Sequence, residues 1–281
     1  MVLKKGICTF AFPSSMSLSE IFFEAKKYGF DGVELCMTLD GPLTPDISDE
    51  ELCRIKADAT SAGIELYSVM TSVYWSASLV SDDESQRELA KSYAKKQIDI
   101  AKKLGCETVL IVPGHTGVDF APDLGVVDYE TAYNRAVEAA KELAPYAQDA
   151  GVVMGMENVW NKFLLSPLEM RNFIDEIDNP YVMAYLDVGN ILVNGYPEHW
   201  VKILGKRISK VHIKDFKMSI GNITGFCDLL SGDVNFPAVT EALRSVGYDG
   251  WITAETGAYK SNNQVMIEHI SSAMNYILKE I

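Results

Sequence analysis

Four short apolar stretches in the second half of the chain each end in a residue of a type that binds metal ions. They are Gly151–Glu157, Tyr181–Asp187, Ile208–His212 and Gly250–Glu255. Three carboxylates with one imidazole suit Mn²⁺, Mg²⁺ or Co²⁺, with Zn²⁺ also acceptable, and fit poorly to metals that prefer thiolates. Each residue alone is equally well explained as an unrelated polar group. Four in order at corresponding places predict one divalent metal site, with Mn²⁺ as the expected ion.

A repeated strand–helix unit must position these four ligands. Eight short stretches are almost continuously apolar, as strands covered on both faces are. They lie at Gly6–Phe12, Gly32–Met37, Ile64–Met70, Thr108–Pro113, Val152–Glu157, Val182–Asp187, Ile208–Lys214 and Trp251–Glu255. Amphipathic helical stretches such as Ser85–Leu104 and Tyr129–Ala147 separate them. Several helices are followed by a glycine where a left-handed cap is favourable, at Gly29, Gly63, Gly105, Gly151 and Gly247.

Eight strands that alternate with helices predict an α/β fold, a single (β/α)₈ or TIM barrel over residues 1–281. The C-terminal ends of all barrel strands face the same way and form the active face, so the four ligands should converge there. An open doubly wound sheet is the alternative. Neither G-x-G-x-x-G after a strand nor G-x-x-x-x-G-K-[ST] occurs, so a nucleotide-binding version of that sheet has no support.

Composition narrows the class of partner. The formal net charge of −14 argues against nucleic acid, which needs a basic surface, and against an anionic membrane. The five cysteines are scattered and odd in number, so they suggest neither a disulfide framework nor a zinc knuckle. The N-terminal residues become polar too quickly for a signal peptide, and no apolar run approaches membrane-spanning length. A cytoplasmic protein with a small-molecule partner is expected.

Residues beside the predicted ligands are candidates for binding the substrate. Strand alternation puts Lys214 on the face of His212, where its ammonium meets either an anionic substrate oxygen or a site carboxylate. Asn158 and Trp160 follow the first ligand. An indole beside polar residues suits stacking on a sugar, and plain packing under the rim is the alternative.

Three further candidates lie near other strand ends. Asn190, three residues after Asp187, either bonds a substrate hydroxyl or caps the next helix. His115 follows the fourth strand and is a substrate contact or an ordinary loop histidine, and Glu34 bonds a substrate hydroxyl or a neighbouring side chain. The longest connection, Asp215–Asn235, is long enough to fold over the barrel mouth.

Six phrases of the chain resemble the xylose-isomerase-like superfamily of sugar phosphate isomerases and epimerases. They are FDGVEL, MEN, LDVGN, VHIKDF, SGDVNF and ITAE, and they span essentially the whole sequence. The ligand order Glu, Asp, His, Glu is specific for this superfamily. LDVGN, the H-[IV]-K-D phrase and SGDVNF are most similar to the branch of L-ribulose-5-phosphate 3-epimerases and ketose 3-epimerases. The resemblance also implies a homodimer or homotetramer.

Three positions depart from the free-ketose epimerases of that branch. Where those enzymes carry a histidine, a substrate-binding glutamate and an arginine, the chain has Asn190, Phe163 and Met218. These departures argue against free-ketose epimerisation of that type and leave a phosphosugar as the alternative substrate. Specificity is expected to depend on Asn190, Phe163, Lys214 and the 215–235 loop.

The ligand set and the resemblance together imply proton transfer through an enediolate. Chelation of the ketose carbonyl and an adjacent hydroxyl would acidify the carbon that bears this hydroxyl. Glu157 and Glu255, on opposite sides, would act as general base and acid and invert carbon 3. The expected function is a metal-dependent ketose or ketose-phosphate 3-epimerase. Reprotonation at the neighbouring carbon or oxygen would instead make it an aldose–ketose isomerase.

Other functions fit the same scaffold. A lyase or dehydratase acting on an oxidised sugar or cyclitol would use the same metal site, and a non-catalytic barrel would serve as a binding or assembly subunit. A three-zinc repair endonuclease is disfavoured, because it needs a basic groove and many more histidines than the four present.

Overall fold

The computed structural model describes residues 3–279, and its centre is a closed barrel of eight parallel strands. Around the barrel the strand order is β1-β10-β7-β6-β5-β4-β3-β2. Their bounds are β1 Lys4–Cys8, β2 Gly32–Met37, β3 Glu65–Thr71, β4 Thr108–Ile111, β5 Val153–Glu157, β6 Val182–Asp187, β7 Ile208–Ile213 and β10 Trp251–Ala254. The predicted TIM barrel is confirmed, and the open-sheet alternative is wrong because β1 pairs with both β2 and β10.

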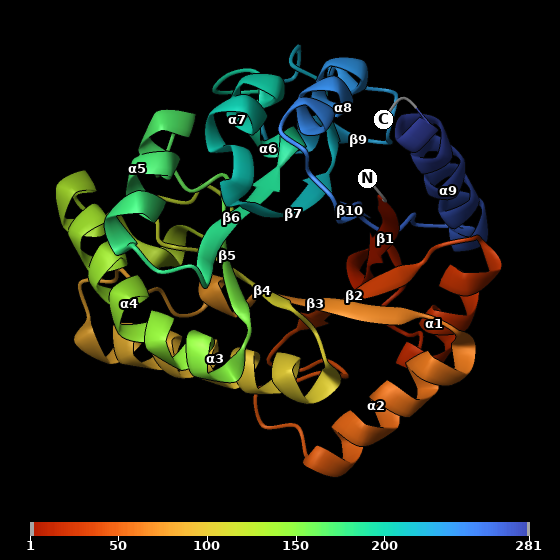
Figure 1. Ribbon diagram of the computed structural model, residues 1–281, viewed down its shortest axis with the longest axis horizontal. Coiled ribbons are helices and arrows are strands. Elements are labelled where there is room, and N and C mark those ends of the chain that lie inside the picture. Colours follow the sequence, from red (N-terminus) through yellow and green to blue (C-terminus); the bar gives the residue numbers. More distant parts are fainter. Residues whose placement is uncertain (1–2, 280–281) are drawn as a thin grey trace.

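Helices form an outer ring around these strands (Figure 1). They are α1 Leu18–Lys27, α2 Asp49–Ala62, α3 Glu84–Leu104, α4 Tyr129–Ala150, α5 Pro167–Ile177, α6 Val188–Ile191, α7 Pro197–Leu204, α8 Phe236–Ser245 and α9 Asn263–Lys279. Gly63, Gly105 and Gly151 adopt left-handed φ values of 70°, 84° and 72° at the ends of α2, α3 and α4, as predicted. Within residues 3–279, no helix is both long and apolar enough to cross a membrane.

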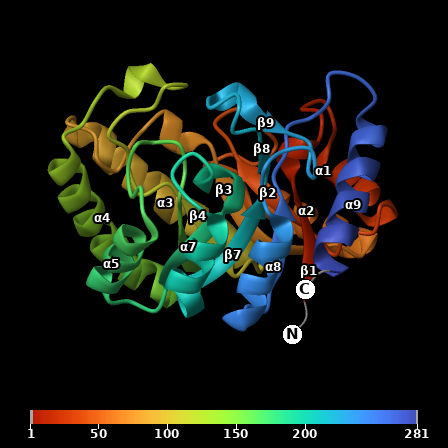
Figure 2. The same ribbon diagram turned by 90° about the horizontal axis from the view of Figure 1, so that it is seen from above.

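The long connection after β7 folds into a small antiparallel hairpin. Its strands are β8 Asp215–Phe216 and β9 Phe226–Cys227. Figure 2 shows β8 and β9 at one end of the barrel, beside the segment that follows β10. Asp215 holds the hairpin loop closed, because its carboxylate accepts hydrogen bonds from the backbone N–H groups of Phe216, Gly232 and Val234. The loop therefore covers the mouth as a braced element.

The largest departure from the predicted strands is in the first one. The sequence predicts a strand over Gly6–Phe12, but β1 ends at Cys8 and residues Thr9–Ala11 form a 3₁₀ turn. The Thr9 hydroxyl accepts a hydrogen bond from the backbone N–H of Cys36, and the thiol sulfur of Cys8 accepts one from Phe10. These local bonds replace the strand ladder, which is why an apolar run stops being a strand there.

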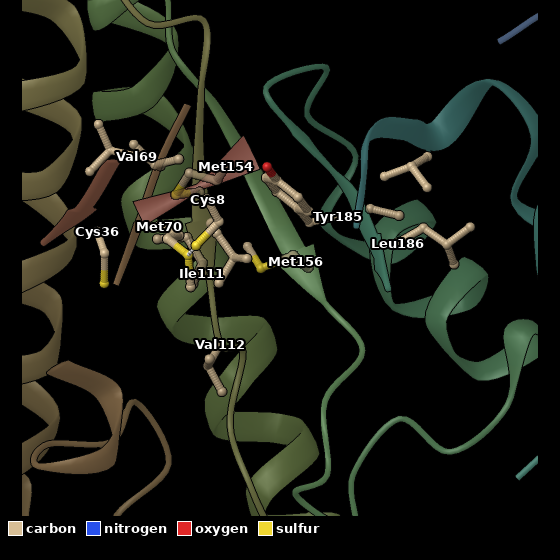
Figure 3. Close-up of a cluster of buried hydrophobic side chains, with 14 of the residues drawn as sticks. Cys8, Cys36, Val69, Met70, Ile111, Val112, Met154, Met156, Tyr185 and Leu186 are labelled. Carbon is tan, nitrogen blue, oxygen red and sulfur yellow. Dashed lines mark hydrogen bonds between the residues drawn. The ribbon is translucent and has the colours of Figure 1, made fainter. Parts of the chain in front are cut away.

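Parallel register decides which side chains point into the barrel. Directly paired residues share a face, and Glu157 pairs with Tyr185 while Asp187 pairs with His212. All four therefore face inward. Residues between inward-facing ones pack against the helices, including Val69, Ile111, Met154, Met156 and Leu186 (Figure 3). Both faces of each strand are thus buried, which explains the apolar runs in the sequence.

Candidate metal centre

The four predicted ligands converge at the mouth of the barrel. One ligand atom from each of Glu157, Asp187, His212 and Glu255 lies within 4.8 Å of the other three. Glu157, Asp187 and His212 lie in β5, β6 and β7, and Glu255 directly follows β10. The closeness of residues up to 98 positions apart follows from the shared direction of the strands.

A buried hydrogen-bond chain fixes the tautomer of His212. Its Nε2 lies 2.6 Å from Glu34 Oε2, and the other carboxylate oxygen of Glu34 accepts a short hydrogen bond from the Tyr185 hydroxyl. All three side chains are fully buried. With a proton on Nε2 facing the carboxylate, Nδ1 is left to face the other ligands, the arrangement found behind metal-binding histidines. The sequence predicted that Glu34 bonds either a substrate hydroxyl or a neighbouring side chain. In the structure its carboxylate contacts two neighbouring side chains, Tyr185 and His212.

The atoms that face the space between the ligands fit a cation. Asp187 Oδ2, His212 Nδ1 and Glu255 Oε2 are buried and face one another, with Nδ1 2.7 Å from Glu255 Oε2 and the Lys214 ammonium 3.2 Å and 3.0 Å from the two carboxylate oxygens. Three clustered carboxylates share one ammonium and one imidazole, so the buried acceptors outnumber the positive charges beside them. Three carboxylates and one imidazole lone pair are ligands for a divalent ion such as Mn²⁺ or Mg²⁺. The donor set therefore fits a divalent metal.

Lys214 supplies a positive charge at the edge of the cluster. Its Nζ lies 3.2 Å from Asp187 Oδ2 and 3.0 Å from Glu255 Oε2. The sequence left a substrate oxygen and a site carboxylate as equal alternatives, and the structure shows contacts with two site carboxylates. The ammonium partly neutralises a group of acids that would otherwise repel one another.

The two glutamates differ sharply in acidity. Burial, reinforced by the charges of Glu255 and Asp187, raises the pKa of Glu157 to about 8 in the metal-free protein. Burial acts in the same direction on Glu255, but the positive charges of Lys214 and His212 outweigh it and lower its pKa to about 2. In the metal-free protein the two carboxyl groups therefore favour opposite protonation states.

Two asparagines shape the backbone around Asp187. Asn158 Nδ2 donates to the carbonyl of Asp187 at 2.8 Å, and the backbone N–H of Asp187 donates back to Asn158 Oδ1 at 2.9 Å. Asn190 Nδ2 donates to the carbonyl of Asn158 at 3.0 Å and lies 3.5 Å from Glu157 Oε1. Asp187 itself caps α6 by accepting from the backbone N–H of Asn190, so the helix cap belongs to Asp187 and not to the Asn190 side chain. A substrate contact for either asparagine stays a prediction.

Aromatic side chains surround the space above the cluster. Trp160 packs edge-on against Phe216 and lies 5.2 Å, centroid to centroid, from Phe226, while its indole N–H donates to the Asn190 carbonyl. The indole also lines a chamber together with Glu157, Glu255 and Lys214. Trp160 therefore packs under the rim and also lines the chamber, and a substrate contact for its indole stays a prediction.

Other candidates lie away from this chamber. His115 is buried, and neither ring nitrogen has a hydrogen-bond partner among the described residues, but it is not among the residues that line the chamber. Phe163 is buried against Tyr129 and Tyr133, so it packs between outer elements. Met218 is exposed on the hairpin loop. A substrate contact for His115 stays a prediction.

Sequence reasoning missed several residues of the site. Tyr185, which orients Glu34, reads as part of an apolar strand, and its role depends on a partner 151 positions away. Phe10, Trp75, Phe120 and Phe226 contribute to the chamber wall, yet each comes from a different loop or short turn. Only the excess of aromatic residues outside the long helices could have suggested them.

A TIM barrel with four convergent metal-type ligands at the ends of its last four strands defines the class of this protein. The chain belongs to the xylose isomerase-like TIM barrel family, whose sequence profile matches residues 22–276. The epimerases described next are similar to it across most of their length.

Two curated relatives and one solved structure illustrate the likeness. The L-ribulose-5-phosphate 3-epimerase of Shigella flexneri serotype 5b is 26% identical over 253 residues, which cover 87% of this chain and 84% of that protein. The D-psicose 3-epimerase of Enterocloster bolteae is 25% identical over 250 residues, 82% of this chain and 76% of that protein. The structure of an L-ribulose 3-epimerase superposes with a TM-score of 0.82 at 17% identity, covering 99% of this chain and 95% of that one.

Proposed function

We propose that this protein is a divalent-metal-dependent epimerase or isomerase of a sugar or sugar phosphate, with epimerisation of a ketose at carbon 3 as the preferred reaction. The observation that carries the proposal is the cluster of Glu157, Asp187, His212 and Glu255, whose ligand atoms all lie within 4.8 Å of one another. The 3-epimerase names of the relatives point to the same reaction class. Mn²⁺ is the proposed ion, with Mg²⁺, Co²⁺ and Zn²⁺ as alternatives, and a homodimer or homotetramer is the proposed assembly.

In the proposed mechanism, the residues of the site have separate roles. A bound divalent metal supplies Lewis-acid polarisation of a carbonyl and its neighbouring hydroxyl. Of Glu157 and Glu255, one accepts the proton from carbon 3 and the other delivers a proton to the opposite face. Glu34 holds His212 in the tautomer that directs Nδ1 into the cluster. The aromatic wall excludes water from the enediolate.

Exchange of a carbon-bound proton with solvent tests this function. The Mn²⁺-loaded protein should incorporate deuterium from D₂O at carbon 3 of a ketose or ketose phosphate, as seen by NMR. EDTA or Glu157→Gln should reduce the rate at least ~100-fold, since removal of a positioned acid or base typically costs about 10²–10⁴-fold. Glu138→Gln on the exposed face of α4 is the matched control and should change nothing.

Absence of exchange with every ketose and ketose phosphate would contradict the proposal. Loss of water from an oxidised sugar or cyclitol, detected by mass, would move the protein to the lyases on the same metal site. A protein that binds no divalent metal, and in which Glu157→Gln has no effect, would be a non-catalytic barrel.

A further inference from the structure

Two adjoining chambers lie over the metal cluster. The inner chamber has a volume of about 150 Å³ and is bounded by Glu157, Glu255 and Lys214 together with aromatic side chains. The outer chamber, of about 540 Å³, lies between the hairpin loop and the segment after β10. They share the lining residues Phe10, Lys214, Ile223, Phe226 and Glu255. A ligand held over the cluster therefore has the outer chamber directly beside it.

The outer chamber is larger than the far end of a single sugar requires. The inner volume of about 150 Å³ is less than a third of the outer one. The outer volume of about 540 Å³ alone falls in the range of about 300–1,000 Å³ that holds drug-sized ligands. The space fits a sugar that carries a substituent of comparable size.

The charges that line this space disfavour an anionic substituent. Of the residues that line either chamber, all within the described part of the chain, Lys214 alone is a cation. Its ammonium already lies within 3.2 Å of the carboxylates of Asp187 and Glu255. Asp228 adds an exposed carboxylate to the outer wall. A phosphate dianion placed there would face carboxylates, with no arginine or lysine other than Lys214 among these lining residues.

The outer chamber lies where many TIM barrels bind a phosphate group, so the charges of its walls bear on whether the substrate is phosphorylated. Phosphate sites of TIM barrels frequently lie between the loops after the seventh and eighth strands, often at a helix N-terminus. Here the same place has acidic and aromatic walls. The N-terminus of α9, the helix that follows, opens elsewhere, because Asn263 and Gln264 line a separate groove against α1. The usual means of holding a phosphate are thus missing from the described walls.

The walls instead suit an uncharged polyol. Phe10, Phe226 and Tyr259 offer ring faces and edges, and Asp228 offers carboxylate oxygens of which Oδ2 already accepts a hydrogen bond from the Tyr259 hydroxyl at 2.7 Å. Aromatic surface for the C–H faces of a sugar, with carboxylate acceptors for its hydroxyls, is the combination that binds a neutral carbohydrate.

We infer that the substrate is an unphosphorylated ketose that carries a neutral substituent, such as a second sugar ring, and that the outer chamber binds this substituent. The inference rests on the proposed epimerase function and narrows it. The loop of the β8–β9 hairpin is then the element that selects the substituent, through Phe226 and Asp228.

Three matched ligands test the inference: a ketohexose, its 6-phosphate and its 6-O-glucosyl derivative. With the Mn²⁺-loaded protein, kcat/KM for deuterium exchange at carbon 3 should be at least ~10-fold higher for the glucosyl derivative than for the phosphate. Calorimetric binding of the three compounds should follow the same order. A 6-phosphate that binds or reacts better than the other two would overturn the inference.

A charge-reversal variant sharpens the comparison. Asp228→Lys should improve binding of the 6-phosphate by ~10-fold relative to the 6-O-glucosyl compound, whereas Glu268→Lys on the exposed face of α9 should leave the ratio unchanged. An unchanged ratio in Asp228→Lys would show that this wall does not meet the substituent. Binding in the expected order without exchange would keep the outer chamber as the site of the neutral substituent and contradict the proposed epimerase. Exchange with the phosphate preferred would support the epimerase and contradict the inferred substituent.

Discussion

Among single residues, His212 is the proposed metal ligand whose surroundings are the most fully determined by the barrel interior. Its Nε2 lies against the buried carboxylate of Glu34, which Tyr185 holds from the other side. The imidazole therefore has one nitrogen committed to the protein and one directed into the cluster. Burial opposes a charged imidazole, but the surrounding carboxylates outweigh it and raise the pKa of His212 well above its ordinary value. A metal must displace that proton, so its affinity depends on how firmly Glu34 keeps the other nitrogen protonated.

Glu34→Gln should therefore weaken metal binding without unfolding the barrel. The amide is of similar size, but its neutral oxygen no longer favours the proton on His212 Nε2. Loss of such an outer partner typically costs about 10–100-fold in metal affinity. Calorimetric titration with Mn²⁺ measures the change, with Glu138→Gln as a control and circular dichroism as a check on folding. Unchanged affinity in a folded Glu34→Gln protein would show that Glu34 is only a core residue.

At the level of elements, the hairpin loop between β7 and α8 supplies side chains that lie above the cluster. Residues 215–235 contribute Phe226 and Asp228 to the chamber walls, and Asp215 accepts three backbone N–H groups of the same segment. A β-carbon on Gly232 would lie 2.2 Å from Asp215 Oδ1, so the close approach of the loop to this carboxylate requires glycine there.

Asp215→Asn should loosen the loop while the barrel stays folded. The amide nitrogen would face a backbone N–H that needs an acceptor, so at least one buried donor is left unpaired at a cost of about 1–3 kcal/mol. We expect faster cleavage within residues 217–231 under limited proteolysis, mapped by mass spectrometry. Asp233→Asn is the milder comparison, because Asp233 accepts only one N–H bond, from Met218, in an exposed position. Equal cleavage of both variants would contradict a bracing role for Asp215.

The sequence predicted the elements better than it predicted the walls of the site. Strand ends carry the ligands, and strand direction alone brings Glu157, Asp187, His212 and Glu255 together, so this part follows from periodicity. The partner of Glu34 and the role of Phe226 depend on side-chain contacts between elements far apart in sequence. Such contacts leave no local pattern, and aromatic residues on loops look the same whether they pack or bind.

For the whole molecule, the cluster links metal binding to the stability of the fold. Three buried carboxylates at one end of the barrel repel one another, and protons, Lys214 or a metal are the available compensation. The folded protein holds a proton on Glu157 up to a pKa of about 8, whereas the unfolded chain releases it near the ordinary value of 4.5. The stabilisation from this proton is complete below pH 4.5 and is lost as the pH rises through 8.

The free energy of unfolding of the EDTA-treated protein should therefore fall between pH 5 and pH 9, and His212, whose pKa is also raised, contributes in the same direction. Glu255 does not alter this trend, because its pKa is lowered to about 2 and its contribution is lost only as the pH falls through that value.

Saturating Mn²⁺ replaces the protons, so the stabilisation by Mn²⁺ should grow with pH. Urea unfolding at four pH values, with and without Mn²⁺, measures both trends. Glu157→Gln should flatten the metal-free slope because it has no carboxyl proton to lose. An equally steep slope in that variant would place the titrating group elsewhere in the molecule.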